Sequence, residues 1–530
     1  MRIPFLLYAL ALAVRVVLIW HFPDPAYPDS FYYVDVARAL SRGEGFSVDF
    51  IWIFPEVGGA IPDDPTLPIP SNAHWMPLAS LVQVPFIAVL GPTAWASALP
   101  FALIGALAAP LTWFVARDAK ASGAVALGAG ILTAVPMLSV VYMTQPDNFS
   151  LYQPLVLGAL WLGARGLRGS PPSFVLAGLL AGLATLSRND GLLVLGALGL
   201  AFAWDRLRAW RSTPHEAPRI PLLAAVACVG LFVAVMTPWW LRQLDVFGSI
   251  SPSTASGKVL YIRDIAEWNS LTTPATLERL LDMGIGPLLA TRIGGLIAAL
   301  MIYTTLVAGF VLAPAMVIGG WARRRSMDFG PFFIYAGLLF AFSALVSAVH
   351  VPGGTFIHSA VALAPHSYIL ALEGIAVGVA WLAARRRTWD PTVATGVFQG
   401  AAIVFAAGAA VAGSAFVHGV WAASREEFRA VAAALDDAGA ATSDRVMSID
   451  ASGTRYWSGR GGVVLVNDPL ETIEEVARAY GIDWLVLERG DSVGAVAALL
   501  DGGPRPAWLG KPILTEGSPL RLAVYPVVAP

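Results

Sequence analysis

A carboxylate in an unusual setting is the first residue of this chain that could do chemistry. Asp29 lies in the stretch Tyr27-Pro-Asp-Ser-Phe-Tyr-Tyr33, just after an apolar run over residues 3–20. A carboxylate held among aromatic side chains can act as a general base, which accepts a proton from a hydroxyl group as that hydroxyl attacks. The alternative is structural, because Asp is also a common N-cap residue. Here it would cap an amphipathic helix that runs through Val34, Ala37 and Leu40 to Gly43 and Gly45.

Other ionisable residues occur at the ends of further apolar runs, and ionisable groups beside membrane spans usually line a cavity or a functional path. They are His74, Asp147, Arg188, Asp190, Arg242, Lys258, Arg263, His350, His358 and His366. Simpler interpretations remain open for each. Asp147 could cap the helix that follows it, and Arg188 could pair with Asp190 at a helix junction. His358 and His366 share roughly one helix face, but no third ligand is spaced for zinc, which argues against a zinc site.

The composition predicts a membrane protein. The chain has 530 residues, of which 57% are hydrophobic and only 13% are charged, whereas soluble chains carry roughly 25% charged residues. A net charge of −2 gives no indication of nucleic-acid binding. Cys228 is the single cysteine, so neither a disulfide within the chain nor a cysteine-based metal site is expected. We expect the first apolar run to be a retained anchor, because prolines rather than a small-residue cleavage site follow it.

Apolar runs of about 20 residues predict membrane spans. Eleven such runs occur, at 3–20, 96–116, 121–142, 149–165, 172–187, 190–205, 220–241, 293–320, 331–349, 359–384 and 394–420. Five short basic hinges separate some of them, near residues 117–120, 165–168, 206–219, 323–325 and 385–387. All five lie on the side of the N-terminus if 75–91 is an interfacial or re-entrant helix, and the positive-inside rule makes that side cytoplasmic. The candidate residues then gather at the extracytoplasmic side.

The chain changes character after residue 421. Helical and strand patterns alternate there, with a helix over 426–435, strands near 445–449 and 484–487, helices over 471–480 and 492–500, and an alternating edge-strand pattern over 520–528. This alternation predicts a small α/β domain. The predicted fold is therefore an all-α polytopic membrane domain over residues 1–421, with about eleven transmembrane helices and some interfacial helices, followed by an extracytoplasmic α/β domain over 422–530. The sequence contains neither a GxGxxG motif nor a P-loop.

Several of these motifs occur in an order and sidedness that resemble a known family. The likeness is carried by these residues, in chain order: Arg15, Asp29-Ser-Phe-Tyr-Tyr-Val-Asp-Val-Ala-Arg-Ala-Leu-Ser-Arg-Gly-Glu-Gly-Phe46, His74-Trp-Met-Pro-Leu78, Pro146-Asp147 and Leu186-Ser-Arg188. They resemble the GT-C superfamily of integral membrane glycosyltransferases, in particular the protein O-mannosyltransferase and aminoarabinose-transferase branch. The resemblance is good over residues 10–200 and extends to the later spans only in layout. Arg15 could also simply snorkel to the interface.

The resemblance implies a glycosyltransferase of the bacterial cell (inner) membrane that takes a sugar from a polyprenyl-phosphate donor at the extracytoplasmic face. Asp29 would be the catalytic base for an acceptor hydroxyl on a glycan, lipid or protein, and an in-line displacement would invert the anomeric carbon. Arg188 would stabilise the leaving phosphate, with His358 and Lys258 as further cations, and His74 and Asp147 would complete the substrate-binding set. A divalent cation held by Asp29 and Asp147 could serve the same purpose.

This sequence departs from the family pattern in two places, and two other classes of function compete. Many relatives have Asp-Glu where this chain has Asp29-Ser30, and the segment Val351-Pro-Gly-Gly-Thr-Phe-Ile-His358 lacks an expected Arg. A lipid or solute transporter also has many spans, but its charges belong at the membrane midplane and its halves are repeats. A scaffold built around the C-terminal domain would leave the outer charged loops without a purpose.

Overall fold

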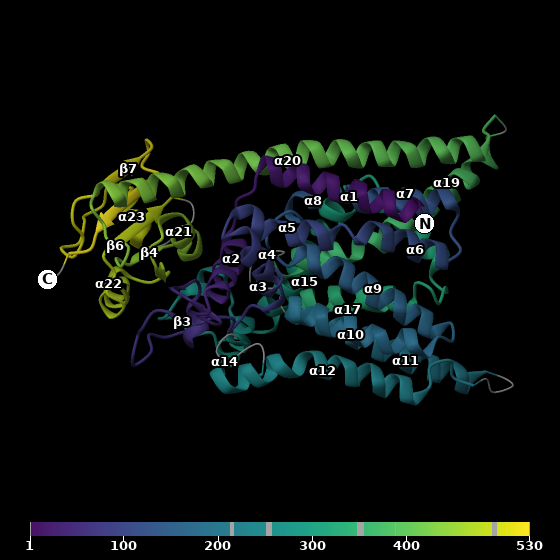
Figure 1. The fold of residues 1–530 in the computed structure, drawn as a ribbon, viewed down its shortest axis with the longest axis horizontal. Helices are drawn as coiled ribbons and strands as arrows, with labels where there is room; N and C mark the ends of the chain where they lie inside the picture. Colours follow the sequence, from purple (N-terminus) through teal and green to yellow (C-terminus); the bar gives the residue numbers. More distant parts are fainter. Residues whose placement is uncertain are drawn as a thin grey trace.

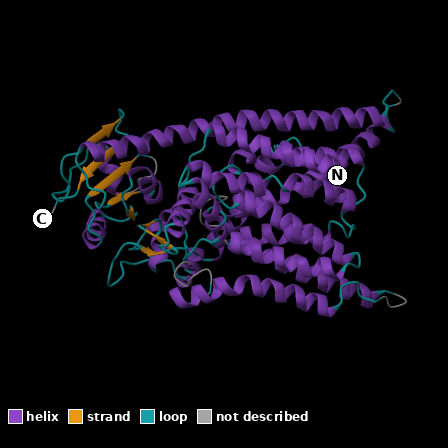
Figure 2. Ribbon diagram, in the orientation of Figure 1, coloured by secondary structure: helices purple, strands orange, loops and turns teal. Residues whose placement is uncertain are grey.

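A computed structural model describes residues 2–212, 217–250, 257–346, 354–386, 388–489 and 495–528. His350, Arg387 and the start of the segment that leads to His358 lie outside these ranges. A bundle of long helices forms one part of the molecule, and a small domain with a β-sheet forms the other (Figures 1 and 2). The two chain ends lie at opposite ends of the long axis, the N-terminus on the helical bundle and the C-terminus on the sheet domain (Figure 1).

The bundle contains helices that are apolar and long enough to cross a bilayer. Among the described residues six such segments occur, at Arg2–His21, Ala94–Asp118, Leu222–Phe247, Ile285–Val307, Phe356–Ala383 and Pro391–Asp437. Shorter apolar helices cover Leu78–Leu90, Gly123–Ala134, Pro171–Ser187 and Gly330–Leu345. Each predicted span overlaps a helix, which confirms the prediction of a mostly helical, multi-pass membrane protein. Helices suit this environment because they satisfy every backbone hydrogen bond within one segment.

The helices of the bundle follow one another in chain order. They are α1 (Arg2–His21), α5 (Ala94–Gly105), α6 (Ala108–Asp118), α7 (Gly123–Ala134), α8 (Ser139–Tyr142), α9 (Phe149–Leu167), α10 (Pro171–Ser187), α11 (Leu192–Arg211), α12 (Leu222–Phe247), α15 (Ile285–Ile302), α16 (Ala313–Arg323), α17 (Gly330–Leu345), α18 (Gly354–Ala360), α19 (Ala364–Ala383) and α20 (Pro391–Asp437). Long outer segments separate α1 from α5 and α12 from α15. The segments beside the sheet domain include α2 (Pro28–Ser41), α3 (Leu78–Leu81), α4 (Val84–Leu90) and α14 (Leu277–Leu281).

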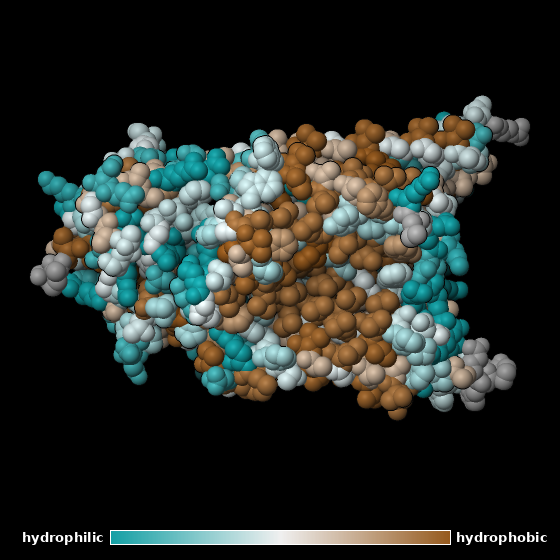
Figure 3. Space-filling model, viewed as in Figure 1, coloured by the Kyte–Doolittle hydropathy of each residue, from teal (hydrophilic) through white to brown (hydrophobic). Residues whose placement is uncertain are grey.

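The surface of the bundle is apolar where lipid would touch it. Hydrophobic side chains cover the middle of the bundle, and hydrophilic ones gather at its two ends and over the sheet domain (Figure 3). Phe5 and Trp20 on α1 are 70% and 79% exposed. Large exposed apolar patches of this kind mark membrane contact rather than a soluble surface.

The polar ends of several helices meet away from the sheet domain. Arg168, after α9, lies 2.9 Å from Asp118 at the end of α6 and 3.3 Å from Asp328, just before α17. Arg219, before α12, donates a hydrogen bond of 3.3 Å to the carbonyl oxygen of Leu167. Four of the basic hinges therefore lie together at one end of the bundle, as the sequence interpretation requires.

Helix α20 connects the two parts of the molecule. Its 47 residues run without a break from Pro391 to Asp437, which corresponds to a length of about 70 Å. Because the hydrocarbon core of a bilayer is about 30 Å thick, α20 extends well beyond the membrane. Helix α20 continues across residues 421 and 422, where the sequence predicted the boundary between the two domains. That boundary stays a prediction. The helix predicted for 426–435 is the end of α20.

The sheet of the small domain has the strand order β2-β5-β4-β6-β8-β7. The strands are β2 (Phe50–Ile51), β4 (Val446–Ser448), β5 (Gly462–Val464), β6 (Trp484–Glu488), β7 (Leu514–Glu516) and β8 (Leu522–Pro526). Strands β2, β5, β4 and β6 are parallel neighbours, whereas β8 is antiparallel to both β6 and β7. The prediction that 520–528 is an edge strand was wrong, because β7 covers the outer side of β8. The sequence pattern did not predict strand β7, which comes just before β8 in the chain and forms the edge of the sheet.

The remaining elements complete the small domain. Its helices are α21 (Ala451–Ser458), α22 (Leu470–Ala479) and α23 (Ala495–Leu500). Strand β2 belongs to the loop that follows α2, so a segment near the N-terminus is part of the C-terminal sheet. Two further strands of that loop, β1 (Ser47–Val48) and β3 (Ile69–Pro70), form an antiparallel pair of their own.

Candidate active site

Asp29 lies in the first turn of α2 and is not its capping residue. Tyr27 occupies the N-cap position. The prediction that Asp29 could cap this helix is therefore wrong. The indole Nε1 of Trp75 donates a hydrogen bond of 2.9 Å to Asp29 Oδ1. Burial raises the pKa of the Asp29 carboxyl, while the Trp75 hydrogen bond and the charge of Arg188 lower it in part. A raised pKa brings a carboxylate closer to the basicity that proton abstraction needs.

Asp147 faces the same point from the turn before α9, and it is fully buried. The hydroxyl of Tyr27 donates a hydrogen bond of 2.9 Å to Asp147 Oδ2, and the backbone N–H of Asn148 donates one of 2.5 Å to Oδ1. Burial, followed by the negative charge of Asp29, raises the pKa of the Asp147 carboxyl to about 7. A carboxylate whose pKa is raised by burial and by a neighbouring carboxylate is typical of sites that move protons or bind cations.

His358 on α18 lies between these two carboxylates. Its Nε2 atom is 3.6 Å from Asp29 Oδ2, and its Nδ1 atom is 3.6 Å from Asp147 Oδ2. The ring stacks on Phe149 with the centroids 4.3 Å apart and an interplanar angle of 16°. This stacking fixes the plane of the imidazole, so each ring nitrogen points to one carboxylate.

Arg188 supplies the positive charge at this site. It follows α10, and its Nε–H is shared between Asp190 Oδ1 at 2.9 Å and Ser359 Oγ at 3.1 Å. The Ser359 hydroxyl in turn donates to the other carboxylate oxygen of Asp190. The sequence suggested that this ion pair could form, and it does. It is a buried pair, since the side chains of Arg188 and Asp190 are 15% and 3% exposed.

Three side chains of this site could together hold a metal ion. One ligand atom each from Asp29, Asp147 and His358 lies within 4.8 Å of the others. Carboxylate oxygen and imidazole nitrogen are ligands that several divalent cations accept. The sequence suggested Asp29 and Asp147 for such a cation, and His358 is an additional donor in the structure.

Comparisons with known proteins support the family suggested by the sequence. The model of the family described as dolichyl-phosphate-mannose-protein mannosyltransferase matches residues 71–240. The structure resembles ArnT from Cupriavidus metallidurans bound to undecaprenyl phosphate, with a TM-score of 0.59 and 15% identity over 99% of this chain and 98% of that chain. The chain has the fold of this ArnT. The apo state of the same ArnT gives a TM-score of 0.56 and 14% identity over 99% and 97% of the two chains. No match was found among curated proteins.

The other predicted site residues lie at different distances from the cluster. His74 is next to it, because its ring packs against Trp75 at 4.9 Å and its carbonyl oxygen accepts a hydrogen bond of 3.0 Å from the side chain of Asn189. Lys258 is exposed and donates a hydrogen bond of 3.0 Å to the carbonyl oxygen of Gly58 in the outer loop. The structure therefore does not place Lys258 in the group formed by Asp29, Asp147, Arg188 and His358.

Four other polar residues that the sequence singled out have structural partners. Arg242 donates a hydrogen bond of 2.7 Å to the carbonyl oxygen of Ser71, and Arg263 pairs with Glu267 at 3.0 Å. His366 stacks on Phe332 in the bundle core. Arg15 does not snorkel: it is fully buried, and its Nη1 donates to the carbonyl oxygens of Ala11 and Ala134 at 3.1 and 3.4 Å. A buried guanidinium is retained there because α7 ends at Ala134 and leaves carbonyl groups to be satisfied.

Sequence reasoning missed several residues that hold the site together. Trp75 and Tyr27 donate directly to the two carboxylates, and Asn148 Oδ1 lies 3.3 Å from His358 Nδ1. Ser359 joins Arg188 to Asp190. Each of them is adjacent in sequence to a predicted residue or lies in the opening stretch, so adjacency was the available signal. The identity of the partners required the fold.

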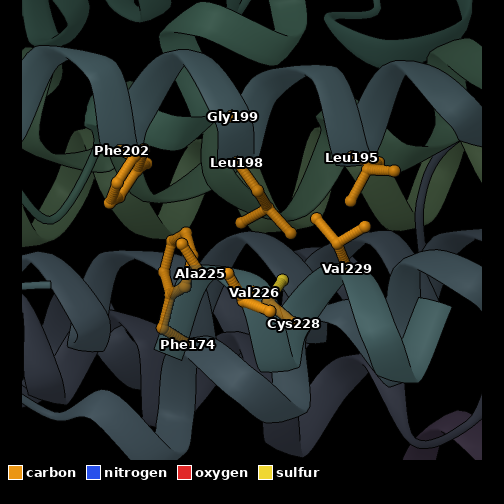
Figure 4. Close-up of a pocket in the computed structure, with 9 residues that line it drawn as sticks. All are labelled: Phe174, Leu195, Leu198, Gly199, Phe202, Ala225, Val226, Cys228 and Val229. Atoms are coloured by element: carbon orange, nitrogen blue, oxygen red, sulfur yellow. The ribbon is translucent and has the colours of Figure 1, made fainter. Parts of the chain in front are cut away.

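A cavity of about 410 Å³ lies away from this cluster, between α10, α11 and α12 (Figure 4). Only apolar side chains, one glycine and the single cysteine line it: Phe174, Leu195, Leu198, Gly199, Phe202, Ala225, Val226, Cys228 and Val229. No charged side chain lines this cavity, so it offers nothing that would bind phosphate. The cavity suits hydrocarbon and plays no part in the chemistry of the polar cluster.

Proposed function

We propose that this protein is a membrane glycosyltransferase that moves a sugar from a polyprenyl-phosphate donor to an acceptor hydroxyl on the extracytoplasmic side. The observation that carries the proposal is the group formed by Asp29, His358, Asp147 and Arg188, which combines two buried carboxylates with a cation. The likeness to an ArnT that was solved with undecaprenyl phosphate supports a lipid-linked donor for this chain as well.

In the proposed reaction Asp29 takes the proton of the acceptor hydroxyl as its oxygen attacks the anomeric carbon of the sugar. The bond from that carbon to the phosphate oxygen breaks, and the lipid phosphate leaves with the bonding electrons. A single in-line displacement of this kind inverts the anomeric configuration. The Trp75 hydrogen bond keeps the Asp29 carboxylate in one orientation for this purpose.

Arg188 would stabilise the charge that the phosphate gains as the sugar leaves. A cation placed for the leaving group stabilises the transition state more than the ground state. The ion pair with Asp190 and the contact with Ser359 hold the guanidinium in place before the donor arrives. A divalent cation held by Asp29, Asp147 and His358 would add a second positive charge to the site.

A direct test uses purified protein and synthetic polyprenyl-phosphate sugars that carry a radioactive sugar. Release or transfer of the label from the lipid is the expected result, and analysis of the product by NMR reports whether the anomeric carbon is inverted. Translocation of the intact lipid across liposomes without cleavage of the sugar bond would instead identify a transporter. If the protein neither cleaves the sugar bond nor moves the lipid, the proposal is overturned.

The proposed orientation gives a prediction of its own. The N-terminus and the basic hinges would be cytoplasmic and the C-terminal domain extracytoplasmic, because positive residues are retained in the cytoplasm. Alkaline phosphatase fused after Arg325 should be inactive, and the same reporter fused after Pro530 should be active. Activity of both fusions, or of neither, would contradict the orientation.

The dependence of activity on pH is a second prediction of the mechanism. A general base must be ionised to work, so the rate should rise with pH as the site loses its proton. Burial raises the pKa of the Asp29 carboxyl and raises that of Asp147 to about 7, so the midpoint should lie above about 3.9, the ordinary pKa of Asp. Single-turnover rates between pH 4 and pH 9 measure it. A rate that is already at its plateau at pH 4.5 would contradict the role of these carboxylates.

A further inference from the structure

The outer domain covers the helix that carries Asp29. On this side of α2, Phe31 lies between Phe428 of α20 and Tyr456 of α21, with ring centroids 5.6 and 5.3 Å apart. Two turns further along α2, the Arg38 guanidinium lies over the Tyr456 ring, with its central carbon 4.6 Å from the ring centroid. Phe31 is 1% exposed, so this face of α2 is a packed contact rather than a free surface.

A hydrogen-bonded contact reaches the residue immediately before Asp29. The hydroxyl oxygen of Ser452, on α21, lies 3.2 Å from the carbonyl oxygen of Pro28 and 2.6 Å from Asp450 Oδ1. Its single hydrogen is therefore shared between these two acceptors. Asp450 is the N-cap of α21 and accepts a hydrogen bond of 2.8 Å from the backbone N–H of Gly453.

The chain that leaves α2 also enters the outer domain. After α2 it forms β2, which pairs in parallel with β5, and the N–H of Gly462 donates a hydrogen bond of 3.1 Å to the carbonyl oxygen of Asp49. A side chain at Gly461 would collide with the Asp49 backbone, and one at Gly462 with the carbonyl group of Val446. These glycines permit the close approach of β2, β5 and β4, which joins the Asp29 segment to the C-terminal sheet.

The opposite side of α2 is fixed by the segment that contains α3. The Ser80 hydroxyl and the Gln83 side chain donate to the carbonyl oxygen of Tyr33 at 3.1 and 3.3 Å, and the Tyr32 hydroxyl accepts from the N–H of Asn72 at 2.7 Å. Helix α2 is therefore held between the outer domain and the α3 segment. The position of its first turn depends on both, because neither set of contacts alone surrounds the helix.

We propose that the C-terminal domain is part of the catalytic unit, and that Ser452 and Asp450 are positioning residues which set the place of Asp29 at the reacting centre. This inference rests on the proposed function. Neither residue is proposed to contact substrate. A catalytic group must be held within about 0.5 Å of its working position by groups behind it, and Ser452 and Asp450 act on the peptide unit that precedes Asp29.

The first test compares two serines of the same short helix in the full-length protein. Ser452→Ala removes the contact with Pro28. Ser458→Ala removes a hydrogen bond of 2.7 Å to the Thr454 carbonyl oxygen and one of 3.2 Å from the Arg460 N–H, neither of which involves α2. Because a neutral hydrogen bond has a modest net value, kcat should fall about 3- to 10-fold in Ser452→Ala, with the donor KM unchanged. Ser458→Ala should behave as wild type, and Ser452→Thr should recover part of the rate. Equal kcat values in Ser452→Ala and Ser458→Ala would overturn the positioning role.

The second test separates the position of Asp29 from simple stability. Asp450→Asn keeps a good N-cap for α21 but replaces the charged acceptor that lies 2.6 Å from the Ser452 hydroxyl by a neutral one. If Asp450 acts through this hydroxyl, Asp450→Asn should change kcat in the wild-type background and have little effect in the Ser452→Ala background. Equal effects of Asp450→Asn on kcat in the two backgrounds would contradict the inference for Asp450.

A third measurement does not depend on activity. Amide hydrogen exchange over residues 28–41 reports how firmly α2 is held, and Ser452→Ala should raise the exchange of its first turns relative to Ser458→Ala. If wild-type protein transfers no sugar, the proposed function fails while this readout still stands. If sugar transfer is normal and exchange in α2 is identical in the two variants, the positioning inference fails alone.

Discussion

Asp29→Asn should lower turnover by about 10²- to 10⁴-fold, because an amide keeps the shape of the carboxylate but cannot accept the proton of the acceptor hydroxyl. The Asn side chain can still accept the 2.9 Å hydrogen bond from Trp75, so the local structure should survive. Affinity for the lipid donor should therefore change little. Single-turnover transfer from a labelled polyprenyl-phosphate sugar measures the rate, and equilibrium binding of the same lipid measures the affinity.

The matched comparison for this variant is Asp147→Asn. Asp147 is the more deeply buried carboxylate and accepts from Tyr27 and from the backbone of Asn148. A similar loss of turnover in both variants would indicate that the two carboxylates act as a pair or share a cation, and a mild effect of Asp147→Asn would leave Asp29 as the sole base. Near-normal turnover in a well-folded Asp29→Asn protein would end the assignment of Asp29 as base.

The membrane architecture could be predicted from sequence because a bilayer imposes a strong and simple constraint. Apolar runs long enough to span it located the helices. Four of the five basic hinges that the sequence placed on one side meet in space, as Arg168 does with Asp118 and Asp328. The outer domain was harder to predict. Its sheet takes β2 from the N-terminal loop and places β7 outside β8, and pairings between distant segments leave no periodic signal in sequence.

The candidate site could be predicted in part for the same reason. Sidedness gathered the candidates Asp29, Asp147, Arg188 and His358 at one end of the bundle, and resemblance to the GT-C superfamily gave Asp29 and Arg188 their roles. Sidedness alone could not separate these residues from Lys258, which lies at the same end but is exposed and bound to the outer loop. Nor could it show that His358 lies between two carboxylates, because residues 29, 147 and 358 meet only through the packing of α2, α9 and α18.

Arg188→Ala should weaken binding of the lipid-phosphate donor by about 10- to 100-fold, since hydrogen bonds to charged groups contribute about 1.5–3 kcal/mol. The effect on turnover should be larger than the effect on binding if the guanidinium follows the charge that develops on the leaving phosphate. Arg188→Lys keeps a point charge but loses the planar, multidentate geometry, so it should recover only part of both. Isothermal titration with a polyprenyl phosphate and single-turnover kinetics give the two quantities separately.

Because Arg188→Ala leaves the buried carboxylate of Asp190 without its partner, part of any loss could come from Asp190 alone. The double variant Arg188→Ala/Asp190→Asn removes that uncompensated charge and provides the control. Donor binding should stay weak in the double variant if Arg188 meets the phosphate, even when the melting temperature returns to that of the wild type. Recovery of donor affinity in the double variant would assign Arg188 to the structure of the α10–α11 junction and leave the donor phosphate to another cation.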